Sequence, residues 1–120
     1  MLIEIPKAWR DPVIAILRRG AAGREILVRQ RARLDWLALT LNPFDSSLFD
    51  AIASALRRDK LQGRACPDMD EPGDTYEFVF DYAADAGTVK VYAKLNLQPD
   101  GKVVIIYSAH RPLKEDQLTA

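Results

Sequence analysis

The feature that most constrains this chain is a strand–turn–strand pattern in its last third. Apolar residues alternate with polar ones from Val89 to Leu97, and an apolar run follows at 103–106. The Pro99-Asp100-Gly101 segment between them predicts a type I turn with a glycine bulge and a three-residue loop. The pattern therefore predicts an antiparallel hairpin. Because the second run is apolar on both faces, we place it inside the sheet.

The length of the turn determines which residues of the hairpin face each other. A three-residue loop places Gln98 opposite Lys102. The remaining predicted pairs are Asn96 with Val104, Lys94 with Ile106, Tyr92 with Ser108 and Lys90 with His110. Because paired side chains point to the same side, one face collects Lys90, Tyr92, Lys94, Ser108 and His110. We expect the core on the other face, with Val91, Leu95, Leu97, Val103, Ile105 and Tyr107.

The first half of the chain predicts helices. Asp11-Pro12 is typical of a helix start, and Gly20 of a helix end. Residues 24–39 mix helical and strand spacing, and we expect them to be partly helical. The clearest helix covers about residues 47–60, with a capping box at Ser47 and Asp50 and basic residues in its last turn. Residues 63–74 read as a polar loop, either functional or a tolerated insertion. Residues 76–82 alternate like a strand.

Length and composition predict a single α+β domain over residues 1–120. We expect N-terminal helices packed on a small C-terminal antiparallel sheet, with residues 1–11 and 112–120 peripheral. Hydrophobic residues make up 48% of the 120, which is enough for a core without metals or disulfides. Trp36 and Phe49 are expected in that core, and Cys66, the one cysteine, is expected to be an incidental thiol.

The distribution of charge and the absence of targeting signals predict a cytoplasmic protein away from membranes. The net charge is zero, but residues 1–64 hold 12 Lys/Arg against 7 Asp/Glu, while residues 65–120 hold 5 against 10. A basic first half can bind a polyanion locally, although a solvated surface is the simpler interpretation of charge alone. No stretch resembles a signal peptide or reaches membrane-spanning length, and one cysteine suits a reducing compartment.

The side chains on the predicted polar face carry the chemistry needed to cleave RNA. Lysines bind and neutralise a phosphate, a histidine moves a proton near neutral pH, and a tyrosine donates a hydrogen bond or stacks on a base. Together these groups could make an RNA 2′-hydroxyl attack its own phosphate. His110 is the sole histidine and lacks a cysteine cluster, so we expect no metal and no cofactor. On spacing alone, an ordinary solvent-facing strand remains the stronger interpretation.

The segments Val91–Leu95 (VYAKL) and Tyr107–His110 (YSAH), joined by the PDG turn, resemble the motility quorum-sensing regulator (MqsR) family of bacterial toxins. These toxins share the RelE-like fold of small microbial ribonucleases. The aromatic strand Tyr76–Phe80 and the upstream helix are similar to the family pattern as well, so the resemblance spans roughly residues 12–112. It departs from the pattern at Ala109, where phenylalanine is expected, and at Lys60-Leu61, where two tyrosines are expected.

The resemblance implies a metal-independent mRNA endoribonuclease, the toxin of a type II toxin–antitoxin pair. In that reading His110 is the general acid or base, Lys94 and Lys60 stabilise the charged phosphorane, and Tyr92 orients the phosphate or the 2′-hydroxyl. Lys90, Ser108 and Arg111 would contact the substrate. The implied partners are RNA and an antitoxin with a helix-turn-helix domain. The alternative is a non-catalytic RNA- or protein-binding module on the same fold, which the changes at Ala109 and Leu61 leave open.

Overall fold

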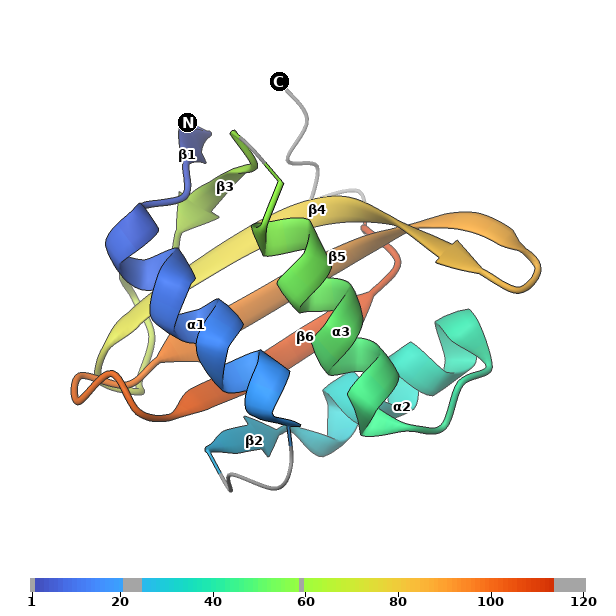
Figure 1. Cartoon of the computed structure of the whole chain (residues 1–120), viewed down its shortest axis with the longest axis horizontal. Helices are drawn as coiled ribbons and strands as arrows, with labels where there is room; N and C mark the ends of the chain where they lie inside the picture. Colours follow the sequence, from blue (N-terminus) through green and yellow to red (C-terminus); the bar gives the residue numbers. More distant parts are fainter. Residues whose placement is uncertain (1, 21–24, 59, 114–120) are drawn as a thin grey trace.

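A computed structural model describes residues 2–20, 25–58 and 60–113 of the chain, and it is an α+β fold, as the sequence predicts. Within these ranges three helices pack against one six-stranded sheet (Figure 1). The elements in chain order are β1 (Ile3–Glu4), α1 (Lys7–Arg19), β2 (Ile26–Val28), α2 (Gln30–Thr40), α3 (Asp45–Leu56), β3 (Gln62–Ala65), β4 (Asp74–Ala84), β5 (Gly87–Leu97) and β6 (Val104–His110).

The sheet is larger than the sequence predicts, and it is mixed. Its strand order is β1-β3-β4-β5-β6-β2, with β2 parallel to β6 and every other pair antiparallel. The predicted strands β4, β5 and β6 lie at its centre, and the apolar β6 is flanked on both sides, as expected. The sequence did not predict β2 or β3, because each is short and depends on its neighbours in the sheet: β2 pairs with β6, and β3 lies between β1 and β4.

The hydrophobic core lies between the helices and one face of the sheet. Tyr76 and Tyr82 of β4 point towards the helices, where their rings contact Trp9 of α1 at 5.0 Å and Trp36 of α2 at 4.9 Å. Trp9 Nε1 donates to the Asp74 carbonyl at 2.9 Å, which satisfies the indole N–H. Trp36 is buried, and so is Phe49 of α3, which confirms the prediction for both residues.

Helix α1 begins a turn earlier than predicted. It starts at Lys7, directly after Pro6, and Pro12 therefore lies inside the helix rather than at its first position. Its end at Gly20 is confirmed: Gly20 has φ +65°, and its N–H donates to the carbonyls of Ile16 and Leu17. Residues 1–11 were expected to be peripheral, but Ile5 and Trp9 are buried in the core.

Helix α3 ends four residues before the predicted end at residue 60. The predicted loop over residues 63–74 is also shorter, because β3 extends to Ala65 and β4 begins at Asp74. The chain leaves the helix after Leu56 and enters β3 at Gln62, so the basic residues that follow Leu56 lie beyond the last turn. Ser47 Oγ donates to the Phe44 carbonyl at 2.6 Å, so it makes no capping box. In residues 24–39 the helical part is α2, and a strand, β2, precedes it.

We predict that Gly63→Ala destabilises the protein more than Gly20→Ala. A Cβ at Gly63 would lie 2.5 Å from the Glu77 backbone oxygen, whereas a Cβ at Gly20 meets open space and only the positive φ opposes it. The expected losses in free energy of unfolding are about 2 kcal/mol or more for Gly63→Ala and about 1 kcal/mol for Gly20→Ala. Urea denaturation measures both, and a Gly63→Ala variant as stable as wild type would contradict the packing of β3 on β4.

Candidate functional site

The turn between β5 and β6 is one residue longer than predicted, which shifts the register beside it. Gln98 N–H donates to the Val103 carbonyl at 2.9 Å, so Gln98 faces Val103 and not Lys102. Lys102 N–H instead donates to Asp100 Oδ1 at 2.9 Å, which keeps Lys102 in the loop. Next to the turn, Leu97 therefore pairs with Val104, and Asn96 pairs with Ile105.

A second irregularity then restores the alternation. The register shifts between Lys94 and Leu95, where Leu95 pairs with Ile106 but Lys94 pairs with Ser108, leaving Tyr107 as the extra residue of a β-bulge. Beyond the bulge, Tyr92 pairs with His110. The predicted pairs were therefore wrong, yet the predicted sharing of a face holds for Tyr92, Lys94, Ser108 and His110.

The changed register also changes which residues of β6 face the helices. The core contains Val104, Ile106 and Ala109, whereas Ile105 pairs with Asn96 on the other side of the sheet. The prediction of Val103 as a core residue was wrong, because Val103 is only half-buried. Ile105 is buried as predicted, with 4% of its surface exposed, but on the side of the sheet away from the helices. Tyr107 is only half-buried, and its ring lies 5.6 Å from the Arg29 guanidinium carbon rather than in the core.

We call the sheet surface that faces away from the helices the open face. On it the His110 imidazole stacks on the Tyr92 ring, with 4.9 Å between centroids and 25° between planes. His110 Nδ1 lies 2.7 Å from the Arg111 carbonyl oxygen. Since a carbonyl only accepts, this contact requires a proton on Nδ1, and the neutral ring then carries its lone pair on Nε2. In this tautomer Nε2 is the nitrogen of the imidazole that can accept a proton.

Glu77 of β4 completes this cluster, and sequence reasoning missed it. In the register of β4 and β5, Glu77 lies opposite Lys94. It is buried, with 7% of its surface exposed. Its carboxylate accepts hydrogen bonds from the Tyr92 hydroxyl and from Arg64 Nε, each at 2.6 Å. Burial acts to raise the pKa of Glu77, but the hydrogen bonds from Tyr92 and Arg64 together outweigh it and hold the pKa below its ordinary value of 4.5. Glu77 is therefore ionised at neutral pH.

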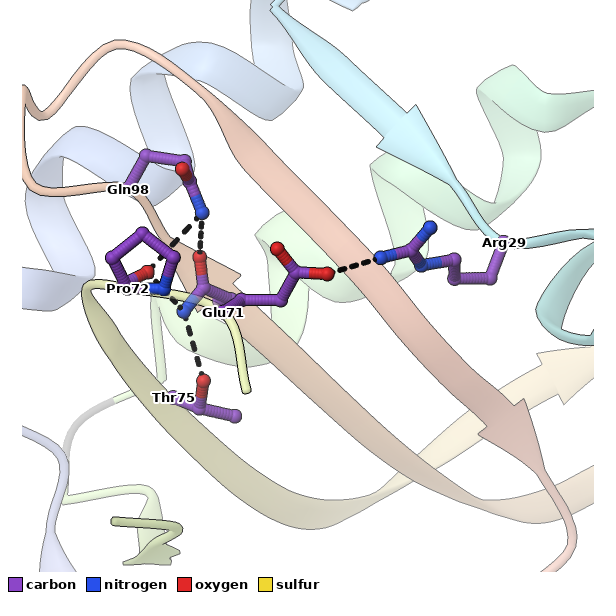
Figure 2. Close-up of polar contacts among 6 residues, drawn as sticks. Arg29, Glu71, Pro72, Thr75 and Gln98 are labelled. Atoms are coloured by element: carbon purple, nitrogen blue, oxygen red, sulfur yellow. Dashed lines mark hydrogen bonds and ion pairs between the residues drawn. The ribbon is translucent and has the colours of Figure 1, made fainter. Parts of the chain in front are cut away.

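One end of the open face is covered by the strap, our name for residues 66–73. The Pro72 carbonyl accepts hydrogen bonds from Asn96 Nδ2 at 3.1 Å and Gln98 Nε2 at 3.2 Å. Glu71 then reaches Arg29, at the end of β2, with 2.6 Å between Oε1 and Nη2 (Figure 2). Beneath this end Asn96 is buried, and its amide donates to Thr75 Oγ1 at 3.0 Å. The strap thus sets one boundary of the candidate site.

The remaining predicted site residues lie at the margin of the cluster or away from it. Lys90 is on the open face but pairs with Asp81, with 3.1 Å between Nζ and Oδ1. Arg111 directly follows β6, and its carbonyl oxygen is the atom that His110 Nδ1 contacts. Lys60 lies in the turn before β3 with φ +63°. Three strand spacings of about 4.8 Å separate β3 from β6, which carries His110. The backbone of Lys60 therefore lies about 14 Å from β6.

In the part of the chain that the structure describes, neither a reactive thiol nor a metal site accompanies this cluster. Burial raises the pKa of the Cys66 thiol to about 11, so it is protonated at neutral pH and is a poor nucleophile. Within residues 2–20, 25–58 and 60–113, no group of three His, Cys, Asp or Glu side chains is placed to hold a metal ion. In the same part of the chain no helix is long and apolar enough to cross a membrane.

No protein-family model, curated protein or solved structure matches this chain. The resemblance to the MqsR toxins and the RelE-like fold therefore rests on the sequence segments that carry it. The polar centre of the open face consists of Glu77, Tyr92, Lys94, Ser108 and His110, with Arg64 at its edge.

We predict that Glu77 makes the fold sensitive to acid. Because its pKa is lowered by folding, it adds stability above about pH 4.5, and that stability is lost as the pH falls through the folded-state pKa. Urea unfolding of wild type should show a free energy of unfolding that falls as the pH is lowered below about 5. Glu77→Gln should be less stable at neutral pH and should show a weaker dependence in that window. An unchanged slope would show that Glu77 is not the linked group.

Proposed function

We propose that this protein is a metal-independent endoribonuclease, the mRNA-cleaving toxin of a type II toxin–antitoxin pair. The observation that carries the proposal is the stacked Tyr92–His110 pair on an open sheet face, with the imidazole Nε2 left to exchange a proton. Lys94 lies opposite Ser108 in the register of β5 and β6, and it supplies a cation on the same face as the Tyr92–His110 pair. The resemblance of VYAKL and YSAH to the toxin strands supports the same reading.

In the proposed reaction the RNA attacks its own backbone. The 2′-hydroxyl loses its proton to a base, its oxygen bonds to the adjacent phosphorus, and the bond from phosphorus to the 5′-oxygen breaks as that oxygen takes up a proton. The products are a 2′,3′-cyclic phosphate and a 5′-hydroxyl. His110 carries out one of the two proton transfers at Nε2, and a pH–rate profile distinguishes which one.

The other residues of the cluster support this step. Lys94 stabilises the negative charge that builds up on the phosphorane, as preorganised cations do in such sites. Tyr92 holds the imidazole by stacking, since its hydroxyl already donates to Glu77. Glu77 in turn fixes Arg64 at the edge of the site, where the guanidinium can contact a phosphate. Lys60 lies in the turn before β3, outside this cluster, so we transfer its expected role to Lys94, whereas Arg64 reaches the edge of the site through its bond to Glu77.

One observation favours the alternative, a non-catalytic RNA-binding module on the same fold. Glu77 already accepts hydrogen bonds from the Tyr92 hydroxyl and from Arg64 Nε, so a phosphate at the edge of the site would meet only the remaining N–H groups of Arg64. Such a module would bind RNA through Lys94 and the remaining surface cations without cleaving it. The two proposals differ in whether RNA is cut, which makes them simple to separate.

We predict that the purified protein cuts a long unstructured RNA in EDTA and leaves cyclic phosphate ends. His110→Ala should slow cleavage by about a hundredfold or more, because it removes a proton-transfer group. Lys94→Ala should slow it by about a hundredfold, whereas the matched control Lys102→Ala, in the exposed turn, should cleave like wild type. Gel electrophoresis of end-labelled RNA measures all four proteins.

The same experiment decides between the two proposals. RNA that is bound but remains intact with wild-type protein would establish the binding module. Cleavage at the wild-type rate by a folded His110→Ala protein would remove the imidazole from the mechanism. Circular dichroism of each variant shows whether a loss of activity comes from a loss of fold.

We further predict that induced expression of the chain arrests bacterial growth and that His110→Ala relieves the arrest. A toxin of this type requires an antitoxin, and we propose that a helix-turn-helix protein encoded next to it suppresses toxicity through direct contact. Growth curves with and without the neighbouring reading frame measure this effect. An equally toxic His110→Ala protein, present at the same level, would contradict the proposed role of the imidazole.

A further inference from the structure

An open groove lies on the helix-covered side of the molecule, opposite the candidate site. Helices α1 and α3 lie side by side across the sheet (Figure 1), and the groove runs along α1 to the C-terminal end of α3. Its volume is about 500 Å³. Four cationic residues line it, and we call it the basic groove; they are Lys7, Arg10, Arg18 and Arg57.

The charge of the basic groove is not neutralised within the described part of the chain. Lys7, Arg10, Arg18 and Arg57 form no ion pair with any residue in that part, and Asp11 is the one acidic residue of the lining. Other arginines are paired with a carboxylate; they are Arg19, Arg29, Arg31, Arg33 and Arg64. A concentration of unpaired like charges around a concave surface attracts an anionic partner.

The floor of the basic groove is apolar, which narrows the kind of anion that fits. Half-buried Ile14 lies on α1 at helical spacing from Arg10 and Arg18, and exposed Ala15 lies next to it, while fully buried Leu56 lies beneath the end of the groove at α3. The lining contains no aromatic side chain on which a nucleic-acid base could stack. An apolar floor with a cationic rim instead matches a helix that has leucine-like residues on one face and carboxylates beside them.

We propose that the basic groove is a docking site for an acidic amphipathic helix of a partner protein. The apolar side chains of that helix rest on Ile14 and Ala15. Its carboxylates pair with Arg10, Arg18 and Arg57, because an arginine can bind a carboxylate through two parallel hydrogen bonds. Because the groove faces away from His110, a partner bound there leaves the open face accessible. The proposal is therefore independent of whether the open face cleaves RNA.

The test is binding of a fluorescently labelled synthetic helix by the full chain, followed by fluorescence anisotropy. The probe peptide carries Leu at positions four apart and Glu at the flanking positions. Arg10→Glu/Arg57→Glu should weaken its binding by about tenfold or more, since two ion pairs become repulsive. The matched control Arg31→Glu/Lys102→Glu makes the same change of charge on α2 and in the β5–β6 turn, and it should bind like wild type.

Two further peptides and an RNA competitor make the test specific. A peptide with Lys in place of Glu, and one with Ser in place of Leu, should each bind at least about tenfold more weakly to wild type. Equal weakening by both double variants, or unchanged binding of the serine peptide, would overturn the proposal. Displacement by single-stranded RNA, together with RNA binding that Arg10→Glu/Arg57→Glu abolishes, would assign the groove to nucleic acid instead. Circular dichroism confirms the fold of each variant.

Discussion

The bulge at Tyr107 is the constraint on which the candidate site depends. The longer turn shifts β6 by one residue against β5, and that shift alone would turn Ser108 and His110 towards the helices. The extra residue at Tyr107 reverses this effect, so that His110 lies opposite Tyr92. Arg29 lies over the Tyr107 ring and also binds Glu71 of the strap, which joins the bulge to the boundary of the site.

The second interaction that organises the open face is the buried carboxylate of Glu77. A buried charge is expensive unless it is paired and hydrogen-bonded, and Glu77 meets that condition through Arg64 on β3 and Tyr92 on β5. Three neighbouring strands are thereby fixed relative to one another by one side chain. The Tyr92 ring, held at its hydroxyl end, then provides a rigid surface for the His110 imidazole.

Sequence patterns were sufficient for the three central strands, for the end of α1 at Gly20 and for the shared face of Tyr92, Lys94, Ser108 and His110. They were insufficient where long-range contacts decide the outcome. The pairing of β2 with β6 has no local signal in three residues. The extra residue of the turn becomes visible only in the hydrogen bond from the Lys102 N–H to Asp100 Oδ1, and the bulge only in the pairing of β5 with β6. Glu77 lies on the polar side of β4, and its importance appears only when β4 is aligned with β5.

The most direct test of this account is the register of β5 and β6 in solution, measured by nuclear Overhauser effects between the strands. The account predicts cross-strand effects between Tyr92 and His110, including their ring protons, and between Lys94 and Ser108. Effects that instead join Lys94 to Tyr107 and Tyr92 to Ala109 would show a hairpin without the bulge, with His110 turned towards the helices. That result would separate the imidazole from the phenol and contradict the site described here.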